Sequence, residues 1–469
     1  MVGEETLYLP LSDLAKRIQA KKLSPVELTE SYLARCEKLN TRFNAYAKLV
    51  PDFALEQARK AEKEIHGGHY RGPLHGMPYA AKDLLSVNGF PTTWGAKPFA
   101  NQSFQTDATV IDHLNRAGAI LLGKAAMIEL AGGMGYRFAS ASLTGPAKNP
   151  WNPEYWTCGS SSGSGAIMAA GLAAFAIGTE TWGSIVCPSG FCGVSGLRPT
   201  YGRVSRFGAM ALSYSMDKIG PICRTAEDCA RVFAVIAGHD PKDRSTLPLD
   251  LAAFTYSPAT EPRKGALRLG RLVNAWRTLE PAVAKCLAEA ERVLRKRFPG
   301  LKDAALPEGP FEAAGNLIIS VEGASAFGDL IRSGRVADLT DPLGQIGGYV
   351  NETISASDYV TALRVRENLQ KKMEDLFDSF DVLVTASMPM AACKLDTNLE
   401  TGLDFPDPLG GIGNLCGLPA LAVPCGFNEI GLPVGLQFIA RAGNDLAVIQ
   451  VARAYQQLTR WHLRHPKIG

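Results

Sequence analysis

Long hydrophobic runs and an excess of charge of one sign are both absent from this sequence. Lysine and arginine number 49 against 46 aspartates and glutamates, which gives a formal net charge of +3 over 469 residues. Such a balance gives no electrostatic reason to expect nucleic acid or an acidic membrane as a partner. The nearest approach to a membrane span, residues 166–177, is interrupted by glycine and falls short of the roughly 18 apolar residues needed. We therefore expect no nucleic-acid partner and no membrane insertion.

A secretion signal and a metal-binding pattern are also missing. Residues 1–17 carry acidic side chains where a signal peptide needs a basic start and then an apolar run. The ten cysteines include no CxxC pair and no Cys/His cluster at metal-ligand spacing. We therefore expect a cytoplasmic protein with reduced, mostly buried thiols and no disulfide, metal or cofactor.

Short apolar runs alternate with amphipathic helices along most of the chain, which is typical of an α/β fold. Residues 1–66 are predicted to be a helical segment, with a capping box formed by Ser24 and Glu27. Residues 67–469 are predicted to form a single domain, and the Pro-rich stretch 257–264 is the best linker candidate. Further helices are expected at 106–116, 167–174, 225–238 and 357–380, and strands or apolar runs at 77–85, 119–123, 175–178, 381–386, 420–427 and 434–439.

The densest run of serine and glycine begins at residue 157. It lacks the lysine that a P-loop needs after its second glycine, and it does not follow the dinucleotide-binding pattern. A flexible linker would not continue directly into an apolar helix at 167–174 and a strand at 175–178. The small hydroxyl residues of this run are therefore expected within the core region.

A serine nucleophile needs a base, which is usually histidine. The seven histidines lie at positions 66, 69, 75, 113, 239, 462 and 465, none of them in a glycine-rich nucleophile context. Lys82 follows an apolar stretch, where desolvation can remove its proton and let the neutral amine act as a base. The alternative is a structural pair between Lys82 and Asp83 at a strand end.

Three runs of this sequence together resemble the amidase signature family. The family patterns G-[IV]-P-x-x-x-K-D, G-G-S-S-G-G-S and D-x-G-G-S-I-R-x-P match residues 76–83, 158–164 and 180–188 in the same order. The resemblance covers residues 74–440 and is weakest at about 240–375. It implies an amidase signature fold, a central mixed twisted β-sheet covered by helices on both faces, with the helical segment at the N-terminus.

The same resemblance implies a site. It places the nucleophile of a Ser-cisSer-Lys triad at Ser184, the bridging hydroxyl at Ser160 and the base at Lys82, with a cis bond between Gly159 and Ser160. The oxyanion hole would be the backbone N–H groups of Thr181, Trp182, Gly183 and Ser184. The substrate pocket is expected to include Gly132, Gly133, Met134, Trp182 and Val186.

The chain departs from the family pattern near the expected nucleophile. Cys158, Ser162 and Trp182 stand where the family has glycine, and Val186 stands where it has arginine. Trp182 places a large aromatic surface beside Ser184, and Val186 removes a cation. We interpret these changes as favouring an uncharged, partly apolar acyl or aryl substrate. The alternative is that Trp182 only fills the core.

Three functions follow from the resemblance. The favoured one is a stand-alone amidase acting on small-molecule amides, anilides and carbamates, with esterase activity included and with similarity to bacterial amidases that accept urethanes. Such an enzyme is expected to be a monomer or homodimer. The second is the glutaminase (A) subunit of a glutamyl-tRNA amidotransferase, indicated by YGRVSRFG at residues 201–208. The third, a non-catalytic binding protein, is disfavoured by the intact triad.

Overall fold

A single large sheet runs through the molecule. The computed structural model describes residues 1–252, 254–257, 265–403 and 406–468, and these form an 11-stranded sheet in the order β1-β3-β2-β4-β6-β5-β10-β11-β9-β7-β8. The strands are β1 Tyr46–Leu49, β2 Pro78–Lys82, β3 Ile120–Ala125, β4 Phe175–Glu180, β5 Ser195–Arg198, β6 Lys218–Cys223, β7 Leu269–Leu272, β8 Lys302–Ala304, β9 Val382–Ala386, β10 Ala420–Phe427 and β11 Pro433–Ala440.

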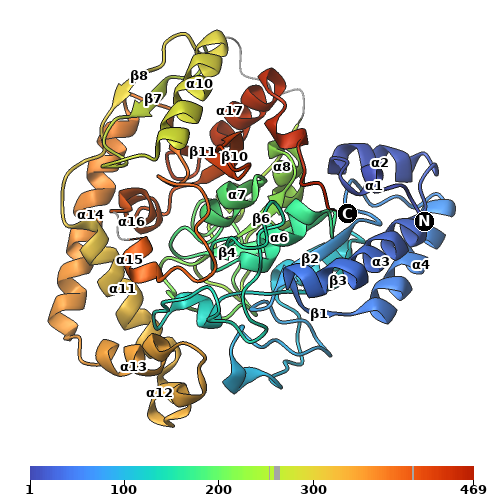
Figure 1. Cartoon of the computed structure of the whole chain (residues 1–469), viewed down its shortest axis with the longest axis horizontal. Coiled ribbons are helices and arrows are strands. Elements are labelled where there is room, and N and C mark those ends of the chain that lie inside the picture. The colour runs from blue at the N-terminus through green and yellow to red at the C-terminus, as the bar shows by residue number, and fades with distance from the viewer. Residues whose placement is uncertain (253, 258–264, 404–405, 469) are drawn as a thin grey trace.

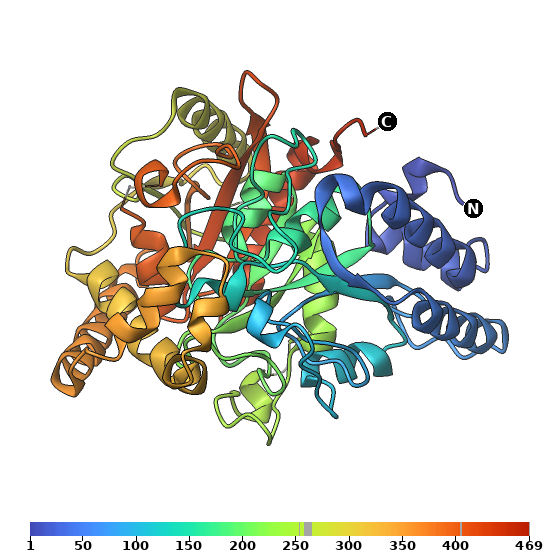
Figure 2. The same cartoon turned by 60° about the horizontal axis from the view of Figure 1, so that its bottom comes forward.

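The sheet is mixed, and helices lie on both of its sides (Figures 1 and 2), so the predicted fold class is confirmed. Strand β2 is parallel to both β3 and β4, and β7 is parallel to both β8 and β9, whereas the other pairs are antiparallel. The helices are α1 Glu4–Leu7, α2 Leu11–Gln19, α3 Pro25–Phe43, α4 Pro51–His66, α5 Thr109–Arg116, α6 Ser162–Ala170, α7 Val186–Cys192, α8 Ala226–Ile236, α9 Leu249–Ala252, α10 Pro281–Arg297, α11 Phe311–Ala326, α12 Gly328–Arg332, α13 Pro342–Asn351, α14 Ala356–Phe377, α15 Leu399–Gly402, α16 Pro408–Leu415 and α17 Asp445–Leu458.

The N-terminal segment is helical, as predicted, but it also adds a strand to the sheet. Asn44 takes a left-handed conformation with φ 52° and ends α3, after which β1 pairs antiparallel with β3 at the sheet edge. Ser24 accepts the Glu27 N–H at the start of α3, while the Glu27 carboxylate meets the N-terminal amine. Of the expected capping box, only the Ser24 hydrogen bond to the Glu27 N–H is therefore seen among the described residues. Helices α1–α4 pack at the end of the sheet formed by β1 and β3 (Figure 1).

The elements around the Ser/Gly run differ from the prediction in their bounds. Helix α6 begins at Ser162 and ends at Ala170, because Gly171 adopts a left-handed φ of 64°. Strand β4 extends to Glu180, two residues beyond the predicted end. Strands β10 and β11 lie where two apolar runs on either side of a turn predicted them. The predicted linker at 257–264 falls, apart from residue 257, outside the described residues.

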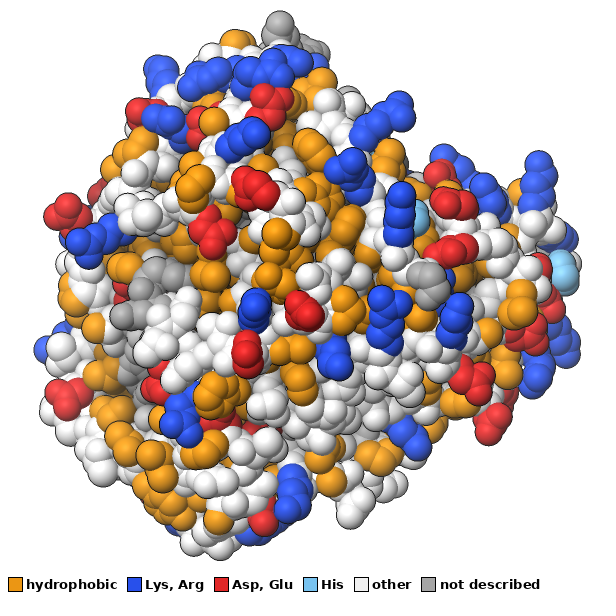
Figure 3. Space-filling model, viewed as in Figure 1, with side chains coloured by type: hydrophobic (Ala, Val, Ile, Leu, Met, Phe, Trp, Pro, Cys, Tyr) orange, Lys and Arg blue, Asp and Glu red, His pale blue; other side chains and the backbone are white. Residues whose placement is uncertain are grey.

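The weakly matched region contributes to the same sheet. Strands β7 and β8 extend the edge beyond β9, while α11 packs against α14 and α16. These helices enclose an apolar cluster separate from the main core, here called the second apolar cluster, which half-buried Trp182 contacts. Its buried members include Val186, Phe311, Ile318, Leu369, Phe377 and Leu415. In the described ranges no helix is long and apolar enough to cross a membrane. Lysine and arginine side chains and acidic side chains both occur over the face shown in Figure 3.

Candidate active site

The three predicted triad residues come from two neighbouring strands and one helix start. Lys82 is the last residue of β2, and Ser184 follows the end of β4 at Glu180. Since β2 and β4 are parallel neighbours, their carboxyl ends lie at the same edge of the sheet. Ser160 lies two residues before α6. The fold thus brings Lys82 and Ser160 into contact and places Ser184 at the same edge.

Lys82 is completely buried among hydroxyl groups. Its Nζ donates to Ser160 Oγ at 2.7 Å, Ser161 Oγ at 3.0 Å and Thr179 Oγ1 at 2.9 Å. Burial lowers the pKa of Lys82 to about 7, although the charges of Asp217 and Glu180 raise it. The neutral amine is therefore available near neutral pH.

Lys82 does not form the alternative structural pair with Asp83. Asp83 instead pairs with buried Lys124, whose Nζ lies 3.0 Å from Asp83 Oδ1. Thr93 also donates to the Asp83 carboxylate through its backbone N–H. Asp83 is thus paired with Lys124. Among the residues that the structure describes, the hydrogen-bond partners of Lys82 Nζ are hydroxyl and carbonyl oxygens alone.

The Gly159–Ser160 peptide bond is cis, as the resemblance implies. Ser160 is buried, and its carbonyl accepts the Ile128 N–H at 3.2 Å. Gly159 has no room for a side chain, because an added Cβ would lie 2.7 Å from Ile128 Cγ1. The backbone beside the Ser160 hydroxyl is therefore fixed by close packing against Ile128.

The loop carrying Ser184 is held by Glu180. One Glu180 carboxylate oxygen accepts the N–H groups of Ile185 at 2.8 Å and Val186 at 3.0 Å. The other contacts Arg198 at 2.7 Å and Asn414 at 3.1 Å. Burial alone would raise the pKa of Glu180, yet the Arg198 charge and these hydrogen bonds lower it to about 2. An ionised Glu180 therefore anchors the start of α7 directly after Ser184.

Ser184 itself is 7% exposed and follows Gly183, whose φ of 73° favours glycine. Gly159 and Gly183, the residues preceding the two serines, line one cavity of about 300 Å³. Within the described part of the chain no hydrogen bond joins Ser160 to Ser184. Catalytic hydrogen bonds often tighten only when substrate binds.

Trp182 lines this cavity and is also packed against helices. Its indole N–H donates to Asp407 Oδ2 at 2.9 Å. A Cβ added at Gly315, Gly410 or Gly411 would lie 2.6, 2.1 or 3.0 Å from atoms of the indole. Glycines on α11 and α16 therefore make the space that Trp182 occupies. The remaining lining residues include Tyr136, Trp156, Met388, Leu403, Glu312, Asn316 and Asp407.

The other predicted pocket residues lie around the cavity rather than in its lining. Val186 is 4% exposed and belongs to the second apolar cluster. Gly132, Gly133 and Met134 lie in a segment whose neighbours Ala131 and Tyr136 line two different cavities. An added Cβ at Gly132 would meet the Tyr136 ring at 2.7 Å. This segment therefore separates the two cavities.

The expectation of no disulfide is wrong. Cys158 and Cys187 are bonded, with their Cα atoms 5.9 Å apart. Both line the cavity beside Ser184, so the bridge joins the segment before Ser160 to the helix after Ser184. The sequence does not predict this pair, because two cysteines separated by 29 positions match no motif. Cys36, Cys192, Cys223, Cys229, Cys286, Cys393, Cys416 and Cys425 are free.

Several residues of the site had no clear sequence signal. Ser161 and Thr179 contact Lys82 beside the predicted Ser160, and Asp407 reaches Trp182 from 225 positions away. The adjacent glycines at 410 and 411 are the one sequence feature that indicates close packing of a large side chain, here Trp182, against helix α16. Among the described residues, no group of three or more His, Cys, Asp or Glu side chains could hold a metal ion.

Comparison with known proteins defines the class as hydrolases of C–N bonds. The Amidase family profile matches residues 27–449, and the chain belongs to the amidase signature family. The A subunit of the glutamyl-tRNA(Gln) amidotransferase from Chloroflexus aurantiacus is 36% identical over 490 aligned positions, covering 99% of both chains.

Two solved structures extend the similarity over nearly the whole fold. The peptide amidase of Stenotrophomonas maltophilia superposes with a TM-score of 0.83 at 29% identity, covering 96% of this chain and 97% of the other. A chain from a vestigial protein complex, described as revealing the origins of an s-triazine catabolic enzyme, has a TM-score of 0.87 at 28% identity. That alignment covers 96% of this chain and 98% of the other.

Proposed function

We propose that this protein hydrolyses a carboxamide-type C–N bond through an acyl-enzyme on Ser184. The observation that carries the proposal is the fully buried Lys82 Nζ, 2.7 Å from Ser160 Oγ. Its pKa of about 7 suits a general base at neutral pH. The family's cis-serine arrangement around residue 160 supports the same roles.

The proposed reaction uses one proton relay in both directions. Neutral Lys82 takes a proton from Ser160 as Ser160 takes the proton of Ser184, and Ser184 Oγ attacks the carbonyl carbon. The backbone N–H groups of residues 181–184 then hold the oxyanion. As the C–N bond breaks, the relay reverses and delivers the proton to the leaving nitrogen. Water activated by the same relay then opens the acyl ester and regenerates Ser184.

The cavity of about 300 Å³ supports an uncharged arm of the substrate. Trp182, Trp156 and Tyr136 supply aromatic surface, while the carboxylates of Glu312 and Asp407 disfavour an anion there. Burial raises the pKa of Asp407 to about 6, so it is largely ionised above neutral pH. We therefore propose a stand-alone enzyme for neutral amides and anilides, with carbamates and esters open to the same acyl transfer.

The A subunit of a glutamyl-tRNA amidotransferase is the second candidate, and sequence similarity favours it over the first. The 36% identity over 99% of both chains and the YGRVSRFG run at 201–208 support it. Glu312 and Asp407 could pair with the ammonium group of glutamine. Against it, Trp182 reduces the polar character of the cavity, and Val186 supplies no cation. This role would require companion subunits.

A substrate panel separates the candidates. The purified chain alone is assayed with an aryl anilide, an aliphatic amide, a carbamate, an ester and glutamine, with Ser184→Ala as the control. Turnover of the neutral anilide supports the stand-alone hydrolase. Turnover of glutamine alone, increased by added amidotransferase subunits, supports the second candidate. No turnover of any compound, with no acyl-enzyme detected by mass spectrometry, contradicts both.

A further inference from the structure

A second cavity, of about 230 Å³, lies on the other side of the loop that carries Ser184. Thr181 lines this cavity, whereas Trp182 and Gly183 line the first one. The segment 131–136 contacts both cavities through its two ends: Ala131 lines the second cavity, and Tyr136 lines the first. The oxyanion loop therefore has a separate space on each side.

The second cavity reaches the contacts of the proposed base. Thr179 lines it and accepts a hydrogen bond from Lys82 Nζ at 2.9 Å. Thr181, whose backbone N–H is proposed to bind the oxyanion, donates its hydroxyl to Asp217 at 2.5 Å in the same wall. Ser184 is not among the lining residues of either cavity, but Gly183 beside it lines the first and Thr181 lines the second. The first cavity takes one arm of the proposed substrate, and this second cavity is available to the other.

The inner wall of the second cavity is apolar. It is lined by Leu84, Met210, Leu212 and Ile219. Phe207 also lines the cavity, and its ring lies beside Lys242. Asp217 is already occupied in this wall, because its oxygens accept from the Thr181 hydroxyl and from the N–H groups of Leu212 and Ser213. This wall is suited to a hydrocarbon stem.

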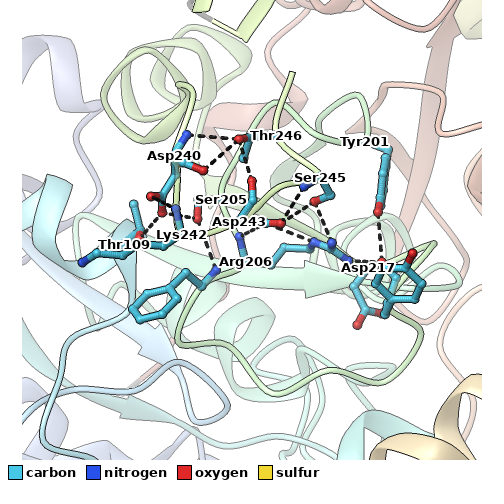
Figure 4. Close-up of polar contacts among 12 residues, drawn as sticks. Thr109, Tyr201, Ser205, Arg206, Asp217, Asp240, Lys242, Asp243, Ser245 and Thr246 are labelled. Atoms are coloured by element: carbon cyan, nitrogen blue, oxygen red, sulfur yellow. Dashed lines mark hydrogen bonds and ion pairs between the residues drawn. The ribbon is translucent and has the colours of Figure 1, made fainter. Parts of the chain in front are cut away.

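The outer wall carries Arg206, which is already occupied. Arg206 contacts the Asp243 carboxylate at 3.4 Å, Ser245 Oγ at 2.6 Å and the Tyr214 carbonyl (Figure 4). Its guanidinium also lies 5.0 Å from the centre of the Tyr201 ring. Arg206 therefore joins the loop at 201–214 to the loop at 240–246 and is not free to bind a ligand ion.

Three cations line this cavity: Arg206, buried Lys218, whose Nζ donates to the Met216 carbonyl, and Lys242. Of these, Lys242 is the one with an exposed side chain. Its Nζ lies 4.9 Å from the Phe207 ring centre.

Asp240, the acid beside Lys242, accepts from the Thr109 hydroxyl at 2.5 Å, the Ser205 hydroxyl at 2.6 Å and the Lys242 backbone N–H at 2.9 Å. In the described ranges Lys242 Nζ forms no ion pair. An apolar stem that fills the cavity would bring its far end to this ammonium group.

We propose that the second cavity is a substrate subsite for an apolar arm that ends in a carboxylate, with Lys242 as the residue that selects the anion. The proposal rests on the amide hydrolysis proposed above and specifies its substrate class. It is an amide with one neutral, aromatic-compatible arm and one acid-terminated aliphatic or aryl arm. The lining of each cavity fits the arm assigned to it. The acidic residues Glu312 and Asp407 line the first cavity, and Lys242 lines the second.

Kinetics on charged and neutral pairs test the proposal. The first pair is glutaryl and pentanoyl 4-nitroanilide, with the charge on the acyl arm; the second is the hexanoyl amides of 4-aminobenzoate and 4-methylaniline, with the charge on the amine arm. In the pair whose charged arm enters this cavity, Lys242→Ala should lower the charged-to-neutral ratio of kcat/KM by about fivefold, the upper range for an exposed ion pair. Lys242→Arg should retain the ratio, and kcat/KM for the neutral compounds should not change.

The matched control is Lys302→Ala, an exposed lysine on strand β8 at the far edge of the sheet. An effect of Lys302→Ala equal to that of Lys242→Ala would overturn the proposal, because it would report general surface charge. Unchanged ratios for Lys242→Ala in both pairs would overturn it too. So would an equal loss for charged and neutral compounds.

A binding measurement separates failure of this proposal from failure of the proposed function. Calorimetric titration of the full chain with 4-phenylbutyrate and with neutral 4-phenylbutanol requires no turnover. Weaker binding of the acid to Lys242→Ala, with unchanged binding of the alcohol, supports the subsite even if no amide is cleaved. Equal affinity of wild type and Lys242→Ala for the acid overturns the subsite even if the enzyme hydrolyses every amide tested.

Discussion

The indole N–H of Trp182 donates a 2.9 Å hydrogen bond to Asp407, which fastens the loop before Ser184 to helix α16. The indole fits against glycines of α11 and α16 and still lines the cavity beside Ser184, the proposed nucleophile. Trp182 thus belongs both to the packing between helices and to the wall of the proposed substrate site. These two roles predict different effects of substitution.

Trp182→Gly should change selectivity more than it changes the oxyanion hole. The backbone N–H groups remain, but apolar contact worth about 1.5 to 3 kcal/mol for a fully buried side chain is lost. We therefore expect kcat/KM to fall by about 10- to 100-fold for aryl anilides, at 1.4 kcal/mol per factor of ten, and less for small aliphatic amides. Asp407→Asn is the control, because its amide oxygen can still accept from the indole. Equal losses for large and small substrates, with a lower melting temperature, would show that Trp182 acts only in packing.

Activity should rise with pH through the range in which Lys82 loses its proton. Burial lowers the pKa of Lys82 to about 7, so acidification below pH 7 protonates the base and stops the relay. The acid limb of kcat/KM for a neutral substrate should therefore have its midpoint near pH 7, and Lys82→Ala should abolish turnover. His75→Gln should leave the limb unchanged, since His75 pairs with Glu64 and not with the triad. A limb near pH 10, the range of an exposed lysine, would contradict the assignment of Lys82.

Reduction of the Cys158–Cys187 bond should destabilise the protein. In the loop-entropy account, a bridge across a separation of 29 positions stabilises by about 3 to 4 kcal/mol. Urea unfolding with and without reductant should show a difference of this size in the free energy of unfolding. The variant Cys158→Gly with Cys187→Ala should not respond to reductant; glycine is suitable because residue 158 has a φ of 66°. Identical wild-type curves under both conditions would show that the bond contributes nothing to stability.

Glu180 should stabilise the nucleophile loop as a charged group. Its pKa is about 2 in the folded protein, against an ordinary value of 4.5. The stabilisation is therefore fully present above about pH 4.5 and is lost as the pH falls toward 2. Glu180→Gln removes the opposite charge from buried Arg198, which keeps its hydrogen bond to the Leu418 carbonyl, and should cost about 3 to 5 kcal/mol. Denaturation curves from pH 7 to 3 test this, and a variant as stable as wild type at pH 7 would refute the role.

Local sequence patterns predicted the sheet better than they predicted the site walls. Strands β10 and β11 are clear because two apolar runs flank a turn at residues 428–433, and Lys82 is recognisable because it ends an apolar run. Strand β1 could not be predicted because four residues of mixed polarity carry no strand signal, and pairing with β3 decides their conformation.

Contacts across long separations could not be predicted from local patterns. The bonds from Trp182 to Asp407 and from Cys158 to Cys187 depend on which helices the fold places beside the nucleophile loop. Val186 illustrates the same limit. Its position two residues after Ser184 predicted a pocket residue, but the first turn of α7 directs it into the second apolar cluster. The triad residues were predicted from the family pattern, whereas Thr179 and Ser161 around Lys82 required the structure.

The most direct test of the account is covalent labelling of the proposed nucleophile. Wild-type protein is incubated with a fluorophosphonate at pH 8, where Lys82 is neutral, and the modified residue is located by peptide mass spectrometry. The account predicts one adduct, on Ser184, which Ser184→Ala abolishes and Lys82→Ala slows by at least about 100-fold, the scale of general-base catalysis. An adduct on Ser161, or labelling that persists in Ser184→Ala, would contradict it.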